Sequence, residues 1–293
     1  MFLPLGDDID KRSLPAIGML LVGINILAFV YEMRLVVDAK GSPHELIEFV
    51  QHWGLVPTSL AQGNIITPVT SMFLHGDLSH LIGNMLMLWA FVGTFERALG
   101  PWRFLGLYLV WGVAGGLTHA VSEWGSTQPM IGASGAISGM IGAYFIAFGA
   151  MANIRTLIWI IKPFQVNIPA GAFVFVWVLD QLFGMHAAHE MGENSIAWGA
   201  HAGGFICGAV TMLVFAREVK GNMVLGKHGA VQFAAAAPVA AAVEEVESVC
   251  TYCGQELTEE NHMSASLFRC PNERCGRLVY LNVPAPVLAA PQA

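Results

Sequence analysis

Charged residues are scarce in this sequence. Only 12% of its 293 residues are Asp, Glu, Lys or Arg, whereas 55% are hydrophobic, and soluble globular domains carry about 25% charged residues. This shortage excludes an ordinary soluble globule and indicates a membrane protein. The basic residues form no patch, so no nucleic-acid partner is expected.

The hydrophobic residues are gathered in runs long enough to cross a bilayer as helices, which takes about 20 mainly apolar residues. The first run is longer than the apolar core of a signal peptide and has no small-residue cleavage site before Glu32, so we expect it to be retained. Six runs together predict an all-α membrane protein with a bundle of six transmembrane helices. They are Leu14–Tyr31, Leu78–Phe95, Phe104–Val121, Ser134–Met151, Ile168–Met185 and Ile196–Phe215.

The composition changes along the chain and divides it into four parts. Residues 1–217 form the predicted six-helix membrane domain, whose first outside loop covers residues 32–77. Residues 218–248 are an Ala-rich linker of low complexity. Residues 249–281 form a small module that carries four cysteines, and residues 282–293 are expected to be a disordered tail.

Basic residues favour the loops that stay in the cytoplasm. With six spans, the outside loops hold only Arg34 and Lys40, so both termini are expected to be cytoplasmic. The compactness of the chain suggests a bacterial source and therefore the inner membrane as its location. In the first outside loop, the segment Pro43–Trp53 has helical apolar spacing. It is expected to lie either in the membrane interface or on the surface of the protein.

Polar side chains inside apolar spans are expensive to keep there and are therefore candidate functional residues. The second, fourth and sixth spans run in the same direction and carry, near their outer ends, His80 and Asn84, then Ser134, then His201. At 1.5 Å per residue, His201 lies about 8 Å into its helix, where water can reach it. A serine beside an imidazole is a nucleophile beside its general base, so Ser134 and His201 are the candidate catalytic pair.

Glycines follow both members of this pair. The patterns Gly135-x3-Gly139 and Gly204-x3-Gly208 allow two helix backbones to approach closely, as the pairing of Ser134 with His201 requires. Taken alone, each pattern is a common helix-packing signal without catalytic meaning.

The pair needs hydrogen-bond donors and a means of orienting the imidazole. His80 and Asn84 lie one helical turn apart and can both point at a developing oxyanion. The alternative is that the two residues are a polar pair that holds helices together.

No acid stands beside His201 in the sequence. Asp180, in the fifth span, either orients His201 as the third member of a triad, makes a structural hydrogen bond, or lies near the interface.

Four motifs in order resemble the rhomboid family of intramembrane serine proteases, over residues 14 to 217. The motifs are the run Phe73-Leu74-His75-Gly76-Asp77-Leu78-Ser79-His80-Leu81-Ile82-Gly83-Asn84-Met85, Glu96-x3-Gly100-x2-Arg103-Phe104, Gly132-Ala133-Ser134-Gly135-Ala136-Ile137-Ser138-Gly139, and Ala200-His201-x2-Gly204-x3-Gly208.

The resemblance implies a serine endopeptidase with a six-helix rhomboid bundle, a Ser134–His201 dyad, no required acid and no cofactor for catalysis. It also implies that His80, Asn84 and the backbone N–H of Ser134 form the oxyanion hole. Substrates would be single-span proteins of the lipid bilayer, cut in or near the outer end of a helix and admitted past the fifth helix. Some relatives carry a Tyr four residues after the nucleophile, packed on the histidine; Ser138 stands there in this chain, so that role is unassigned.

The cysteine spacing near the end of the chain indicates a metal site. Thiolates in pairs separated by two to four residues are typical zinc ligands, and a segment this short cannot fold on an apolar core alone. A cytoplasmic module favours structural zinc over disulfides. We expect a zinc-ribbon-like fold with a strand at Leu278–Tyr280 and a cytoplasmic protein partner, His262 being a weaker substitute ligand. The four ligands are Cys250, Cys253, Cys270 and Cys275.

Two other functions remain open at this point. A transporter or channel would use the histidines as a proton or metal path, and Ser134 would then be dispensable. A non-catalytic rhomboid-like binding protein would be favoured had Ser134 or His201 been missing, and both are present.

Overall fold

The computed structural model forms two compact units, one made of Met1–Val224 with Ala230–Phe233 and the other of Leu225–Gly229 with Ala234–Ala293. The residues that the structure describes are 2–7, 9, 14–38, 44–149, 152–159, 162–191, 197–221, 223–225, 231–233, 262–264, 267–269, 271 and 278–280.

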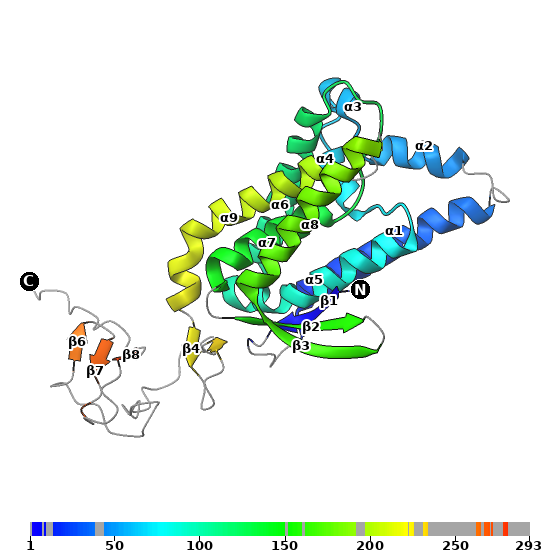
Figure 1. Cartoon of the computed structure of the whole chain (residues 1–293). Coiled ribbons are helices and arrows are strands. Elements are labelled where there is room, and N and C mark those ends of the chain that lie inside the picture. The colour runs from blue at the N-terminus through cyan, green and yellow to red at the C-terminus, as the bar shows by residue number, and fades with distance from the viewer. Residues whose placement is uncertain are drawn as a thin grey trace, which may run out of the picture. The chain divides into compact units, whose positions relative to one another are not determined.

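The first unit is mostly helical (Figure 1), and a helix lies in each of the six predicted spans. Within the described residues, four helices are long and apolar enough to cross a membrane, namely α1, α5, α6 and the part Trp198–Ala216 of α9. Helix α7 and the part Ala170–Phe183 of α8 are apolar but shorter, so six crossings remain a prediction. The helices are α1 (Ala16–Asp38), α5 (Leu78–Leu99), α6 (Pro101–Ser122), α7 (Ser134–Phe148), α8 (Ala170–Met191) and α9 (Trp198–Gly221).

Local signals set several of these helix ends. Asp77 accepts a hydrogen bond from the His80 backbone N–H and caps α5. Gly100 separates α5 from α6 with a φ of +79°, which favours glycine, and Pro101 follows as the first residue of α6. The Glu96 carboxylate accepts from three backbone N–H groups at the start of α1, at 2.8, 3.0 and 3.1 Å. Glu96 therefore ties the end of α5 to the beginning of α1.

The first loop contains the predicted helix, here α2 (His44–Trp53), followed by α3 (Pro57–Ala61), α4 (Thr67–Thr70) and a 3-10 turn at Ser71–Phe73. Helix α2 has no buried residue, and in Figure 1 it projects beside the end of α1. Phe49 of α2 packs edge-on against Tyr31 of α1, with ring centroids 5.3 Å apart. A helix in this segment is therefore confirmed, and α1 runs further into the loop than the predicted end at Tyr31.

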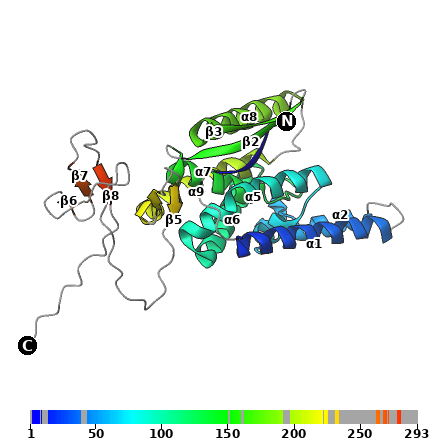
Figure 2. The same ribbon diagram turned by 90° about the horizontal axis from the view of Figure 1, so that it is seen from below.

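A small sheet was not expected from the sequence. Strands β1 (Phe2–Asp7), β2 (Asn153–Trp159) and β3 (Pro163–Pro169) pair antiparallel in the order β1-β2-β3, and Figure 2 shows them beside the start of α8. Asp7 at the end of β1 is buried and accepts hydrogen bonds from Thr94 of α5 and Tyr144 of α7. The N-terminal strand is thus anchored to the helix bundle by a buried carboxylate.

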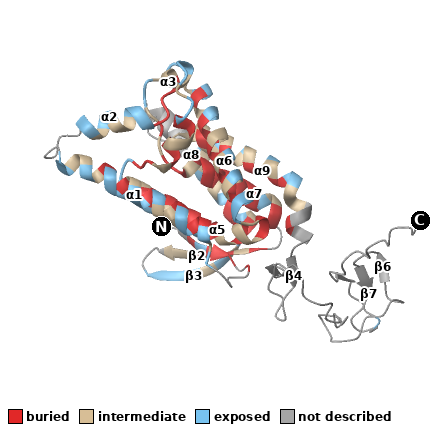
Figure 3. Ribbon diagram, turned by 180° about the vertical axis from the view of Figure 1, so that it is seen from behind, coloured by how far each residue is buried: buried red, intermediate tan, exposed pale blue. Residues whose placement is uncertain are grey.

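Helices α7 and α9 pack closely against each other, and Figure 3 shows buried residues along α7. Backbones of α7 and α9 touch at glycines: a Cβ added at Gly208 would lie 1.8 Å from the Gly139 carbonyl oxygen, and one at Gly204 would lie 2.0 Å from that of Gly135. Contacts advance together along both helices, so α7 and α9 run parallel, as predicted for the fourth and sixth spans. A side chain at either position would force the helices apart.

In the second unit, strands β6 (His262–Ser264), β7 (Leu267–Arg269) and β8 (Leu278–Tyr280) form an antiparallel sheet in that order. Strand β8 confirms the strand predicted at Leu278–Tyr280. The four predicted zinc ligands lie outside the described residues, so zinc binding stays a prediction.

Two short strands, β4 (Met223–Leu225) and β5 (Val231–Phe233), pair within the segment predicted to be a linker.

Candidate active site

The two residues predicted to form the catalytic pair are in contact. Ser134 is the first residue of α7 and His201 lies in the first turn of α9. Because these helices are parallel and meet at their glycines, the side chains face one another, and Ser134 Oγ lies 2.9 Å from His201 Nε2. This distance allows the hydroxyl to donate a hydrogen bond to the ring nitrogen.

The second nitrogen of His201 has a partner that the sequence analysis missed. His201 Nδ1 lies 2.6 Å from the side-chain oxygen Oε1 of Gln181, in α8. Asp180, which the sequence offered as a third member of a triad, instead accepts a 3.3 Å hydrogen bond from the amide Nε2 of Gln181. No sequence signal separates the two residues, since Gln181 is an ordinary polar residue next to the only carboxylate in the span.

The ring of Trp198, three residues before His201 on α9, contacts the imidazole. The rings of Trp198 and His201 meet edge to face, with centroids 5.9 Å apart at 82°. Ser138, one turn after Ser134, is buried and donates a 2.7 Å hydrogen bond to the Ser134 carbonyl oxygen. Ser138 thus supports the first turn of α7.

His80 and Asn84 both approach the backbone just before Ser134. A Cβ built at Gly132 would lie 2.8 Å from the His80 ring and 3.6 Å from the Asn84 amide nitrogen. Gly132 has a φ of +120°, a backbone conformation that residues with a side chain rarely adopt. Because glycine has only a hydrogen atom at this place, the His80 ring and the Asn84 amide have room beside it. Because Ser134 begins α7, its backbone N–H lacks a partner within the helix. His80 and Asn84 therefore lie beside the backbone that leads into Ser134.

A buried polar chain supports Asn84. Asn84 Nδ2 lies 3.0 Å from His75 Nε2, in the segment between the 3-10 turn and α5. Burial, together with the neighbouring His80, lowers the pKa of His75 to about 4, so His75 is neutral at pH 7 and accepts a hydrogen bond from the amide. The His75 backbone N–H is held by both carboxylate oxygens of Glu32 at 3.2 Å, and Glu32 is fully buried on α1. Helix α1 is thereby linked to the candidate oxyanion donors.

Loss of the helix cap at Asp77 is expected to lower the stability of the protein. Asp77→Ala removes the acceptor for the His80 backbone N–H and is expected to lower the free energy of unfolding by about 1 kcal/mol. Thermal unfolding in detergent should show this as a fall in Tm of roughly 2–4 °C.

The stabilisation that this cap provides depends on pH. The Ser79 hydroxyl and the His80 backbone N–H lower the pKa of Asp77, so its stabilisation is present above the ordinary aspartate pKa of about 4 and is lost as pH falls through the lower, folded value. The Tm difference between wild type and Asp77→Ala should therefore shrink in strong acid. Asp77→Asn keeps a capping oxygen and serves as the control; equal melting of all three proteins at pH 7 would contradict the prediction.

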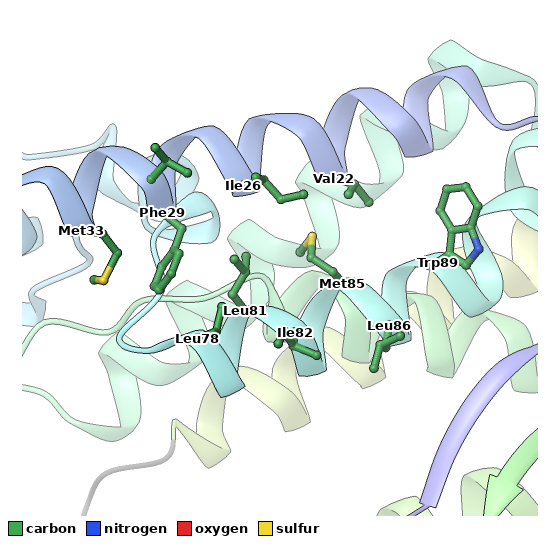
Figure 4. A pocket seen from close by; sticks show the side chains of 11 residues that line it. Val22, Ile26, Phe29, Met33, Leu78, Leu81, Ile82, Met85, Leu86 and Trp89 are labelled. Atoms are coloured by element: carbon green, nitrogen blue, oxygen red, sulfur yellow. The ribbon is translucent and has the colours of Figure 1, made fainter.

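A large cavity is lined by residues other than those of this site. Its volume is about 640 Å³, and Figure 4 shows side chains of α1 and α5 converging on it. The residues that line it carry no ionisable group, so it offers no chemistry for hydrolysis, and the polar cluster is the better candidate site. Its lining is Val22, Ile26, Phe29, Val30, Met33, Leu78, Leu81, Ile82, Met85, Leu86 and Trp89.

Comparisons with known proteins point to one family. A family model described as "Rhomboid domain" matches residues 62–218. Rhomboid protease GluP of Bacillus subtilis is 28% identical over 199 residues, which is 68% of this chain and 35% of that protein. Rhomboid protein 1, mitochondrial, of Saccharomyces cerevisiae is 28% identical over 149 residues, or 50% of this chain and 40% of that protein.

A shorter match has higher identity. Putative rhomboid protease YdcA of Bacillus subtilis is 35% identical over 89 residues, which is 29% of this chain and 42% of that protein. The chain thus spans between about a third and two fifths of the length of these curated relatives.

Proposed function

Because the chain belongs to the rhomboid family, we propose that it is an intramembrane serine endopeptidase with Ser134 as nucleophile and His201 as general base. Relatives named as rhomboid proteases support intramembrane protease activity in general, and the family match together with apolar helices supports an integral membrane protein. The observation that carries the proposal is the 2.9 Å separation between Ser134 Oγ and His201 Nε2.

The proposed reaction is acyl transfer to serine. Ser134 Oγ attacks the carbonyl carbon of the scissile peptide while His201 Nε2 takes the hydroxyl proton. The C–N bond then breaks as His201 returns this proton to the leaving amine. A water molecule, deprotonated by His201 in the same way, then attacks the acyl-enzyme. The ester C–O bond to Ser134 breaks, His201 returns the proton to Ser134 Oγ, and the second product leaves as the acid. The reaction needs no metal or organic cofactor because serine and imidazole supply all the proton transfers.

The oxyanion of each tetrahedral intermediate would accept hydrogen bonds from His80, Asn84 and the Ser134 backbone N–H. Each good donor of this kind supplies roughly 3 kcal/mol of transition-state stabilisation. The crowding of His80 and Asn84 against Gly132 supports this assignment, since Gly132 lies two residues before the nucleophile.

Proposed substrates are single-span membrane proteins, cut in or near the outer end of their helix. Helix α7 has 15 residues and is about 22 Å long, less than the roughly 30 Å of hydrocarbon in a bilayer. Such a helix is too short to reach both membrane surfaces, which supports a position of Ser134 below one surface, where water from that side would reach it. The peptide must unwind to reach Ser134, so a substrate helix weakened by small or helix-breaking residues is favoured.

The proposal is tested by reconstitution. Purified protein in liposomes is incubated with a model single-span substrate, and the wild type is compared with Ser134→Ala and His201→Ala. Products are separated by gel and the cut bond is located by mass spectrometry. A transporter with no hydrolytic role would leave the substrate intact in all three samples, and cleavage that survives both substitutions would remove the proposed mechanism.

For the second unit we propose structural zinc held by Cys250, Cys253, Cys270 and Cys275, in a cytoplasmic module that recruits a protein partner. This accords with both termini in the cytoplasm and with a bacterial inner-membrane location, which are part of the proposal. The supporting observations are the cysteine spacing and the small three-stranded sheet β6-β7-β8, since such a sheet has little apolar core of its own.

The zinc proposal predicts about one zinc ion per chain in protein purified without chelator. Inductively coupled plasma mass spectrometry should find this metal in the wild type and should find it lost when Cys250 and Cys253 are both changed to serine. Cys207→Ser is the matched control, because Cys207 lies in α9 outside the motif and its loss should leave the zinc in place. A wild-type protein without zinc, or a double variant that keeps it, would refute the site.

A further inference from the structure

The catalytic histidine of the proposed dyad makes contacts through both ring nitrogens. His201 Nε2 faces Ser134 Oγ at 2.9 Å, and Nδ1 faces Gln181 Oε1 at 2.6 Å. A neutral imidazole carries one hydrogen and one lone pair, so the partner of Nδ1 decides what Nε2 offers to the serine.

The orientation of the Gln181 amide is set by its other end. Its Nε2 donates a hydrogen bond to Asp180 Oδ2 at 3.3 Å. A carboxylate oxygen and an amide oxygen are both acceptors and cannot hydrogen-bond to each other. The amide nitrogen of Gln181 therefore faces Asp180, and Oε1 is the atom that faces His201. Because Oε1 only accepts, His201 Nδ1 must carry the hydrogen. Nε2 then keeps its lone pair and can take the proton of Ser134.

Helix packing places Gln181 at this point. Trp177 and Phe205 stack with ring centroids 5.7 Å apart and an interplanar angle of 20°. Trp177 lies four residues before Gln181 on α8, and Phe205 lies four residues after His201 on α9. The two contacts are therefore one helical turn apart on both helices, which run in opposite directions. The aromatic stack holds the register in which Gln181 reaches His201.

We propose that Gln181 is a positioning residue that holds His201 in the tautomer and orientation needed to accept the Ser134 proton. The dyad is thus extended to Ser134–His201–Gln181, with the exposed Asp180 acting only through the amide of Gln181. This inference rests on the proposed function. Some relatives carry a Tyr at the position of Ser138, packed on the catalytic histidine. The contact with Gln181 would keep the imidazole of His201 aligned in this chain, which lacks that Tyr.

The role of Gln181 differs from that of a buried aspartate in a triad. A neutral carbonyl oxygen fixes the tautomer, but it stabilises the imidazolium less than a carboxylate does. Loss of one hydrogen bond to a group that becomes charged corresponds to roughly 10- to 100-fold in rate. The expected effect is therefore on kcat, with KM for the substrate unchanged, because Gln181 contacts His201 and not the peptide.

The test compares two substitutions of matched size in the full chain, reconstituted in liposomes with a single-span substrate. Gln181→Met keeps the length of the side chain and removes the acceptor, and it should lower kcat roughly 10- to 100-fold without changing KM. Gln181→Glu keeps an acceptor at the same place and should restore most of the rate. Labelling of Ser134 by a fluorophosphonate probe should slow in Gln181→Met in parallel, since it reports serine activation without peptide binding.

Leu182→Met is the matched control, because Leu182 is the next residue on α8 and is 52% exposed; its kcat should equal that of the wild type. Gln181→Asn, whose amide is one methylene shorter, provides a second variant if Gln181→Met does not fold, and it should show the same loss. A folded Gln181→Met or Gln181→Asn protein with the wild-type kcat, or a Gln181→Glu protein as slow as Gln181→Met, would overturn the inference. Cleavage by Ser134→Ala would instead overturn the proposed function, so the two failures are distinguishable.

Discussion

Replacing Ser134 by alanine is expected to reduce cleavage of a reconstituted single-span substrate by about 10⁴-fold or more, and His201→Ala is expected to reach the same level. The two effects should be alike because Ser134 and His201 act as one unit across the 2.9 Å contact between Oγ and Nε2. The double variant should therefore be no slower than either single variant. Residual cleavage, if measurable, would come from the oxyanion donors alone. The measurement is the initial rate of product formation, followed on gels over hours.

A nearby serine provides the control. Ser138 lies one turn further along α7, and its hydroxyl contacts the Ser134 carbonyl oxygen rather than His201. Ser138→Ala is expected to retain cleavage within a few-fold of the wild type, since one helix-supporting hydrogen bond is worth about 1 kcal/mol. If Ser138→Ala were inactive and Ser134→Ala active, the nucleophile would have been assigned to the wrong residue.

The second large effect is expected at Gly208. In Gly208→Ala, the new Cβ would lie 1.8 Å from the Gly139 carbonyl oxygen and 2.7 Å from the Gly139 Cα. These atoms belong to the backbone of α7 and cannot rotate away, so α7 and α9 must separate. Overpacking of this kind costs about 3 kcal/mol. Ser134 and His201 lie on the same two helices, and a displacement of about 1 Å can reduce the rate roughly 100-fold.

The measurements for Gly208→Ala are thermal unfolding in detergent and substrate cleavage by the fraction that remains folded. The matched control is Gly106→Ala, because Gly106 lies within α6 and a Cβ there would meet no atom within 4 Å. Gly106→Ala should be neutral or stabilising by up to about 1 kcal/mol. Unchanged Tm and activity in Gly208→Ala would mean that the two helices are not in contact at Gly208.

Much of the helical framework could be predicted because its signals are local. Apolar runs of about 20 residues marked the positions of α1, α5, α6, α7, α8 and α9, and the spacing in Pro43–Trp53 marked α2. Capping and turn residues such as Asp77 and Gly100 set boundaries within a few residues of those expected. The glycine patterns at Gly135 and Gly204 predicted a close approach of two helices, which is where the backbones of α7 and α9 meet.

The sheet could not be predicted in the same way. Strands β1 and β2 are short, and the pairing of Phe2 with Ile158 joins two segments that are separated in sequence by the helices α1 to α7. Hydropathy along the chain contains no information on such a pairing. Nor does hydropathy explain why a carboxylate at position 7 is buried, because its partners Thr94 and Tyr144 come from helices α5 and α7.

By itself, the sequence determined that this chain is a helical membrane protein of the rhomboid type. It also marked Ser134 and His201 as the candidate pair, since composition, helix period and motif order are properties of the chain alone. Only the tertiary structure decided that Gln181 and not Asp180 contacts His201. Consecutive residues on a helix point about 100° apart, so the rotation of α8 selects between these neighbours. That rotation is set by packing against α9, through contacts such as the stack of Trp177 on Phe205, and no local pattern encodes it.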